Sequence, residues 1–119
     1  MTPQSAKSKG RTLQKFVCAR LHEVFSFLGL EPDDFLSRSM GANGTDVIFS
    51  PLATKLIGDF PIECKNVEKL NVPQVYAEHA AKYPGKKALL IHKKNHSKVL
   101  VTLSLDDFMT ILEGHVRAR

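Results

Sequence analysis

An aspartate and a downstream Glu-x-Lys triplet are the residues of this sequence best suited to chemistry. They are Asp46 and the run Glu63-Cys64-Lys65. In a β-strand alternate side chains share a face, so Glu63 and Lys65 would lie on one face about 7 Å apart. Paired strands lie about 4.8 Å apart. If the strand that begins at Asp46 pairs with the strand that carries Glu63, two carboxylates and one ammonium converge.

Two carboxylates this close repel each other unless a positive charge lies between them. Mg²⁺ takes oxygen ligands and keeps several waters, so Asp46 and Glu63 suit Mg²⁺, or Mn²⁺ as a substitute, with the backbone carbonyl of Cys64 as a third ligand. Lys65 could orient the attacking water and stabilise charge as a phosphodiester is attacked. The alternative is that Glu63 and Lys65 form an ordinary ion pair on a solvent-facing strand.

The surrounding sequence resembles the PD-(D/E)xK nuclease superfamily, and within it the small phage-encoded endonucleases related to archaeal Holliday junction resolvases. The resemblance rests on Asp46…Glu63-x-Lys65 and on two segments, SMGANGTDVIFS (39–50) and PIECKNVE (61–68), and it covers roughly residues 12–105. It implies a restriction-endonuclease-like core, with a mixed sheet and flanking helices. It also implies metal-dependent cleavage of DNA, substrates with branches or junctions, and a homodimer.

The resemblance assigns roles to residues outside the motif as well. Glu23 corresponds to an acidic catalytic residue on the first helix, although it could instead pair with Arg20. Arg38 corresponds to an arginine that contacts phosphate. Either Gln74 or Glu78 corresponds to a polar residue on the helix after the catalytic strand. Thr45 stands where relatives often have proline, so an endonuclease that cuts nicks or flaps is an alternative to a junction resolvase.

Basic residues are concentrated in two stretches of the chain, 1–20 and 79–105, neither of which contains an acid. The net charge is +5. Such zones indicate a polyanion partner, most simply nucleic acid, or else a solvated lysine surface. A non-catalytic nucleic-acid-binding module and an assembly protein with a soluble surface are therefore the other function classes to consider. The predicted DNA contacts are Lys7, Lys9, Arg11, Arg38, Lys93, Lys94 and Lys98.

Hydrophobic periodicity predicts the order helix, strand, strand, helix, strand, strand, helix, which is a small mixed sheet of the α/β or α+β class. Residues 1–11 are predicted to be a flexible basic arm and residues 12–119 a single nuclease domain. Thr12 is the predicted N-cap of the first helix, and Gly114 is predicted to end the last one. The predicted helices are 12–30, 72–83 and 105–113, and the predicted strands are 46–49, 60–65, 87–93 and 99–103.

Composition excludes several classes of protein. The 119 residues suffice for one core, and 43% of them are hydrophobic, as in soluble globular proteins. No apolar run is long enough for a membrane span, and the N-terminus lacks a secretory signal, so an intracellular, cytoplasmic protein is expected. Cys18 and Cys64 are too few for a disulfide framework, and the five histidines lack zinc spacing. Gly41-x-x-Gly44 is no P-loop, so no nucleotide cofactor is expected.

A homodimer is also expected from the size of the chain. One small domain offers one active site, whereas cutting two strands needs two sites, and a twofold dimer supplies them most simply. The candidate dimer surfaces are the apolar faces of the 88–103 hairpin and of the last helix, which carries Phe108, Ile111 and Leu112. Both surfaces could equally belong to the core.

Overall fold

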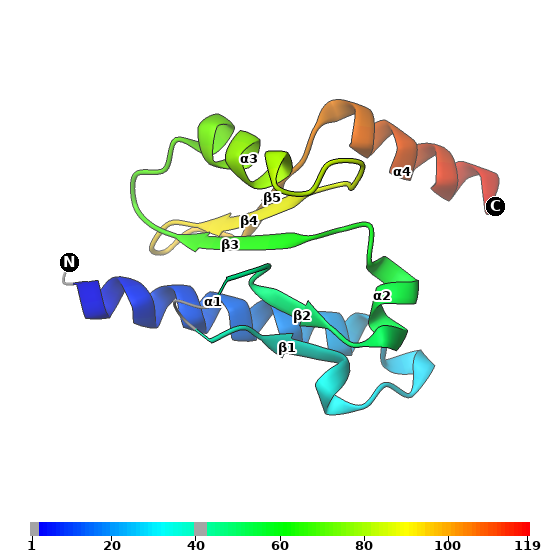
Figure 1. Ribbon diagram of the computed structural model, residues 1–119, viewed down its shortest axis with the longest axis horizontal. Coiled ribbons are helices and arrows are strands. Elements are labelled where there is room, and N and C mark those ends of the chain that lie inside the picture. The colour runs from blue at the N-terminus through cyan, green and yellow to red at the C-terminus, as the bar shows by residue number, and fades with distance from the viewer. Residues whose placement is uncertain (1–2, 40–42) are drawn as a thin grey trace.

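The structure is a computed structural model that describes residues 3–39 and 43–119. It is an α+β fold, in the broad class expected (Figure 1). Met40, Gly41 and Ala42, which belong to the first segment of the resemblance, lie outside the described residues. The elements in chain order are α1 (Pro3–Val24), β1 (Phe35–Ser37), β2 (Val47–Phe49), α2 (Pro51–Ile57), β3 (Ile62–Asn66), α3 (Val72–Ala81), β4 (Leu89–Lys93), β5 (Leu100–Thr102) and α4 (Leu105–Arg117), with short 3₁₀ turns at Ser26–Leu28 and Pro32–Asp34.

The strands form two hydrogen-bonded sheets. In the first, β1 and β2 are antiparallel. In the second, β3 pairs parallel with β4, and β4 pairs antiparallel with β5. Asp46, immediately before β2, joins the two sheets because its backbone N–H donates to the Ile62 carbonyl of β3 at 3.0 Å. The strand at 46–49 therefore meets the strand at 60–65 at one residue, whereas continuous pairing was expected.

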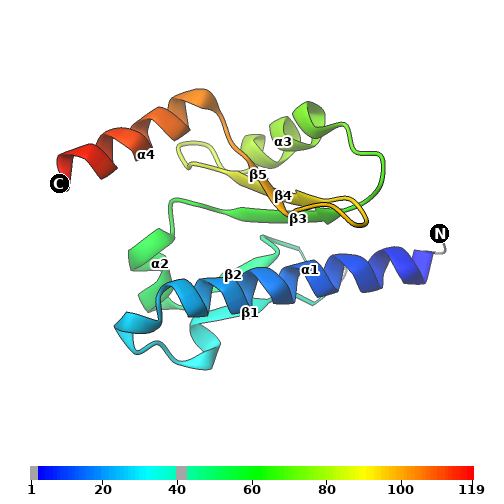
Figure 2. The same ribbon diagram turned by 180° about the vertical axis from the view of Figure 1, so that it is seen from behind.

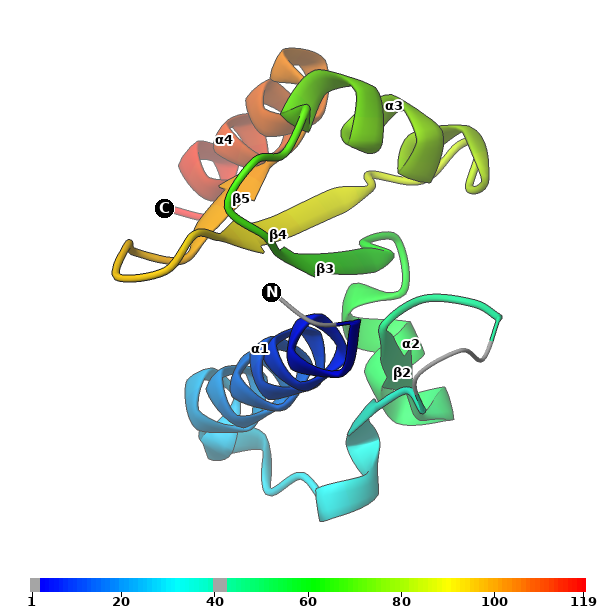
Figure 3. The same cartoon turned by 90° about the vertical axis from the view of Figure 1, so that its left-hand side faces the viewer.

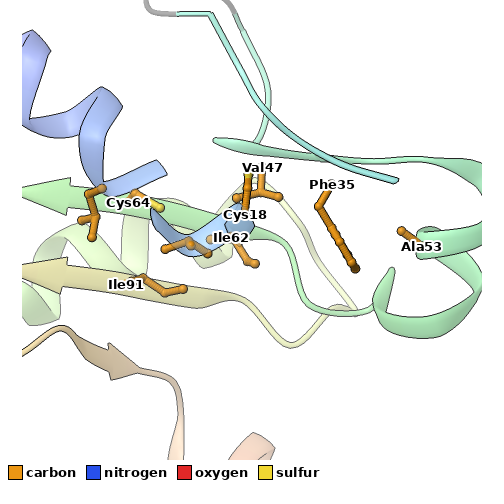
Figure 4. Close-up of a cluster of buried hydrophobic side chains, with 9 residues drawn as sticks. Cys18, Phe35, Val47, Ala53, Ile62, Cys64 and Ile91 are labelled. Atoms are coloured by element: carbon orange, nitrogen blue, oxygen red, sulfur yellow. The ribbon is translucent and has the colours of Figure 1, made fainter. Parts of the chain in front are cut away.

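Helices α1 and α3 lie on opposite faces of β3 and β4 (Figure 3). The core lies between α1 and the strands, where α1 buries Leu13, Val17 and Cys18. Val17 and Cys18 lie four and five positions after Leu13, so the three side chains share one broad face of the helix. Figure 4 shows the other contributions to this cluster, from Phe35, Val47, Ala53, Ile62, Cys64 and Ile91.

Residues 3–11 are helical, which corrects the expectation of a flexible arm for this part of residues 1–11; residues 1–2 lie outside the described residues. Helix α1 begins at Pro3, and proline is well tolerated in a first helical turn because its missing N–H would have no partner there. Thr12 is an interior residue rather than the N-cap. Its hydroxyl donates to the Ser8 carbonyl one turn back, at 2.9 Å.

Three further boundaries differ from the prediction. Strand β1 was missed because it has only three residues and follows a turn. Residues 51–57, to which the sequence patterns assign neither helix nor strand, form helix α2, whose N-cap Ser50 accepts a hydrogen bond from the Ala53 N–H. Helix α4 does not stop at Gly114 but continues to Arg117, because one glycine costs a helix only about 1 kcal/mol. None of the helices in the described part of the chain is long and apolar enough to cross a membrane.

Candidate functional site

Asp46 is held against the open edge of β3 by two hydrogen bonds. Besides its backbone bond to Ile62, its carboxylate Oδ2 accepts the Cys64 N–H at 2.7 Å. The Pro61 carbonyl faces β4, since it accepts the Leu89 N–H at 2.9 Å. Backbone groups of successive residues alternate between the two edges of a strand. The N–H and carbonyl of Cys64 consequently both face away from β4, on the side where Asp46 lies.

Glu63 lies next to this aspartate and is only 20% exposed. The pKa of Glu63 is raised to about 7. Burial is the largest cause, followed by the charge and hydrogen bonding of the Asp46 carboxylate, while the charges of Lys65 and Lys82 act in the opposite direction. The two carboxylates lie together even though the strands that carry them meet only at Asp46.

Lys65 shares the face of Glu63, as the alternation predicts. Its Nζ lies 3.9 Å from Glu63 Oε1, beyond hydrogen-bond distance, and its side chain is 43% exposed. A contact this long at a solvated position contributes little to stability. The ammonium therefore remains free to contact another group at the mouth of the site.

His79 of α3 completes the inner wall of the site, and sequence reasoning missed it. It is 2% exposed, and its Nε2 lies 2.9 Å from the Pro61 carbonyl. Burial lowers its pKa, so the ring is neutral at pH 7. A carbonyl oxygen only accepts hydrogen bonds, so Nε2 carries the proton of the ring. Nδ1 therefore presents a lone pair, 3.8 Å from Glu63 Oε2, and it has no hydrogen-bond partner in the described part of the chain. The only local sign was that Val75 and His79, at i and i+4, lie on the same face of α3.

A cleft of about 70 Å³ separates β3 from α3 at this point. Glu78 lines it, whereas Gln74 does not line it but donates from Nε2 to Glu78 Oε1 at 3.2 Å. Of the two residues that the sequence left open, Glu78 is thus the one at the site. The cleft residues are Glu63, Lys65, Val75, Glu78, His79 and Lys82.

The structure does not bring Glu23 to this site. Its carboxylate is 67% exposed and pairs with Arg20 at 2.9 Å, which was the alternative reading. Gln14 shows which part of α1 lies near Asp46. It accepts a hydrogen bond from the Ser37 hydroxyl of β1 at 2.8 Å, and Ser37 pairs with Val47, the residue after Asp46. Glu23 lies farther along α1 by about 13 Å, at a rise of 1.5 Å per residue.

Arg38 supports the loop that leads to Asp46. Its Nε donates to the Thr45 carbonyl, and its backbone N–H donates to the Asp46 carbonyl at 2.9 Å. The guanidinium also packs on Gly44, where a Cβ would lie 2.7 Å from Cζ and where φ is 113°, a conformation that favours glycine. Arg38 thus has a structural role in holding Asp46, beside the phosphate contact that the resemblance implies.

The two basic zones of the sequence meet in space. Lys9 Nζ of α1 donates to Asn95 Oδ1, in the turn between β4 and β5, at 2.7 Å. A pocket of about 320 Å³ lies between this half of α1 and the hairpin, and Lys93 and Lys98 line it. Lys7, Arg11 and Lys94 are exposed. Six of the seven predicted DNA contacts therefore belong to α1 or to this hairpin.

The donor set fits a hard divalent cation. Two carboxylates lie together with an unfavourable charge on Glu63, and the Cys64 carbonyl faces the same side. In the described part of the chain no cluster of three or more His, Cys, Asp and Glu side chains is placed to hold a metal.

Comparison with known proteins gave no match. No family model matches the sequence, and no curated protein or solved structure matches it.

Proposed function

We propose that the protein is a metal-dependent endonuclease that hydrolyses phosphodiester bonds in DNA, built on a restriction-endonuclease-like core. The observation that carries the proposal is the pair Asp46 and Glu63 at the open edge of β3, with Lys65 on the same face. Burying two adjacent carboxylates is unfavourable by itself, and the raised pKa of Glu63 measures that cost. A bound cation removes the cost, so the arrangement is well explained by a metal site.

The roles follow from the chemistry of each group. Asp46, Glu63 and the Cys64 carbonyl would hold Mg²⁺, with Mn²⁺ as a substitute. When bound, the metal supplies charge stabilisation and a more acidic water. The Lys65 ammonium orients the attacking water and stabilises negative charge on the phosphate. His79, fixed through Nε2 by the Pro61 carbonyl, closes the inner wall and limits the movement of Glu63. Lys82, the C-cap of α3, also lines the cleft and adds positive charge.

The substrate that we propose is branched DNA such as a four-way junction. The support is the joined basic surface of α1 and the β4–β5 hairpin, together with the resemblance of the sequence to junction resolvases. Two opposed strands of a junction require two active sites, which a homodimer supplies. Nicked or flapped DNA is the competing substrate class.

The test compares cleavage of a labelled four-way junction with cleavage of linear and nicked duplexes of the same sequence. We expect symmetrical cuts in the junction with Mg²⁺ and none in EDTA. Glu63→Gln removes a metal ligand while keeping the shape of the side chain, and it should lower the cleavage rate by at least about 100-fold. Lys65→Ala should reduce cleavage while leaving metal binding, measured by calorimetry, nearly unchanged.

Glu23→Gln is the matched control, because this exposed carboxylate lies at the far end of α1 and should be dispensable. Cleavage that survives in Glu63→Gln would overturn the proposal. Tight DNA binding without any cleavage would show the non-catalytic module instead. Cuts confined to nicked or flapped DNA would retain the nuclease and reject the junction as its substrate.

A further inference from the structure

Helix α4 projects from the body of the molecule (Figures 1 and 2). Five of its large apolar side chains fall on one stripe, at i, i+3, i+4, i+7 and i+11. Each of them is at least 39% exposed, and none of the residues of α4 is buried. The stripe consists of Leu105, Phe108, Met109, Leu112 and Val116. A helix with this pattern needs an apolar partner surface, and its own chain leaves the stripe open.

A second open apolar surface lies on the same chain, between α1 and the sheet. This α1–β5 groove has a volume of about 580 Å³. Phe16 and Val24 of α1 are 48% and 54% exposed, and Val101 of β5 is 52% exposed. Arg20 and Lys98 also line the groove, so its surroundings are basic. The apolar residues that line it include Phe16, Val17, Val24, Ile91, Val99 and Val101.

The stripe and the groove are parts of one surface. Val101 lines the groove and also a shallower hollow that Leu105 and Phe108 line at the start of α4. The apolar surface therefore runs from α1 across β5 and out along α4. Exposed apolar patches beyond a few hundred Å² are uncommon on monomers and mark interaction sites.

Ser104, the N-cap residue just before α4, fixes the outward direction of the helix. The Ser104 N–H donates to the Tyr76 hydroxyl of α3 at 3.1 Å, and the Ser104 hydroxyl accepts the Asp107 N–H as the N-cap. Only Leu103 and Ser104 separate β5 from α4. Folding α4 back over β5 into its own groove would break the Ser104–Tyr76 bond and would require these two residues to reverse the chain. The occupant of the groove must then come from another molecule.

We propose that α4 of one copy of this chain lies in the α1–β5 groove of a second copy, and reciprocally. The area that such a contact would bury supports this occupant. A helix of 13 residues is about 20 Å long. Two such helices, each seated in a groove, bury on the order of the 1,600 Å² that a stable dimer needs.

The first experiment measures the mass of the protein in solution by light scattering. Wild type should be a dimer, at twice the 13.3 kDa of the chain. Leu112→Asp on the stripe and Val24→Asp in the groove should each weaken the dimer at least 100-fold in dissociation constant. Leu52→Asp is the matched control, since this leucine of α2 is 49% exposed outside both surfaces. Far-UV circular dichroism checks that every variant is folded.

The second experiment identifies which surfaces meet. Both natural cysteines are buried, so introduced ones react selectively. A mixture of Leu112→Cys and Val24→Cys should cross-link between chains with a short bis-maleimide, whereas Leu112→Cys with Leu52→Cys should not.

A monomeric wild type would overturn the proposal. So would a dimer that Val24→Asp leaves intact, because α4 would then pair with α4. None of these measurements depends on metal, DNA or cleavage, so they test the dimer separately from the nuclease activity. A monomer would leave that activity open and would count only against a junction as the substrate, since two opposed cuts need two sites.

Discussion

At the scale of single residues, the unusual feature is a carboxylate pair that costs the apo protein stability. Glu63 ionises near pH 7 because it is buried beside Asp46, and the nearest cation, Lys65, is 3.9 Å away. Natural sequences retain such unfavourable pairs mainly at functional sites. The effect of the pair on the free energy of unfolding depends on pH, and this dependence can be measured without any substrate.

Glu63 should make the metal-free protein less stable as the pH rises. Its pKa is about 7 in the folded state and near 4.5 otherwise, so its contribution is fully present below about pH 4.5 and is lost as the pH rises through 7. In EDTA, the free energy of unfolding of wild type relative to Glu63→Gln should fall across this window, on the order of 2 kcal/mol. Urea unfolding of both proteins at pH 4.5 and 7.5 measures it.

Added Mg²⁺ should restore stability to wild type at pH 7.5 and leave Glu63→Gln unchanged, since only the ionised carboxylate binds the cation. A difference between the two proteins that stays constant with pH would show that the pKa of Glu63 is not raised in the folded protein.

At the scale of elements, the short connection from β2 to β3 sets the geometry of the site. Helix α2 carries the chain between these strands, and Asp46 can reach Cys64 only if α2 turns the chain correctly. Ser50 is central to this turn because it caps α2 and also donates from its hydroxyl to Asp34 at 2.5 Å. Asp34 in turn accepts the Glu31 N–H at 2.7 Å, which ties the start of β1 to α2.

Ser50→Ala should therefore destabilise the protein by about 1 to 3 kcal/mol, because it removes the N-cap and leaves the buried Asp34 carboxylate with one partner fewer. Ser97→Ala, in the exposed turn between β4 and β5, should stay within about 0.5 kcal/mol of wild type. Thermal or urea denaturation distinguishes the two. Equal stabilities would mean that Asp34 and Ser50 do not act together.

At the scale of the whole molecule, the decisive arrangement is the meeting of two basic zones that are far apart in the sequence. The contact between Lys9 and Asn95 joins the first half of α1 to the β4–β5 hairpin. A polyanion such as DNA can then contact both zones at once. Binding to phosphates releases counterions, so the strength of binding depends on salt.

Replacing Lys93 and Lys98 together by alanine should weaken binding to duplex DNA of any sequence. The slope of log K against log salt should become shallower by about 1.8, at about 0.9 for each phosphate contact. Fluorescence anisotropy in EDTA, at salt concentrations between about 50 and 200 mM, measures both the affinity for DNA and its salt dependence. Lys55→Ala is the control, because α2 lies at the opposite end of the molecule from the N-terminus of α1 (Figure 1). An unchanged slope in the double variant would place the DNA elsewhere.

Local patterns made much of the site predictable from the sequence. Strand alternation placed Glu63 and Lys65 on one face and Cys64 on the other, and the structure agrees, with Cys64 in the core. The predicted start of the last helix at residue 105 is confirmed, because α4 begins at Leu105 with Ser104 as its N-cap. These features depend only on residues close together in the chain, so strand alternation and helix capping suffice to predict them.

Only the tertiary structure decided the features that depend on distant parts of the chain. They include the placement of Glu23 away from Asp46, the contact of His79 with the Pro61 carbonyl and the outward direction of α4. In each case the position of a second element decides whether a side chain meets a partner or solvent. The sequence by itself therefore determined which residues could act together, and the packing of α1 and α3 on the sheet decided which of them meet. The physical reason is that periodicity defines the faces of an element, whereas burial depends on what packs against each face.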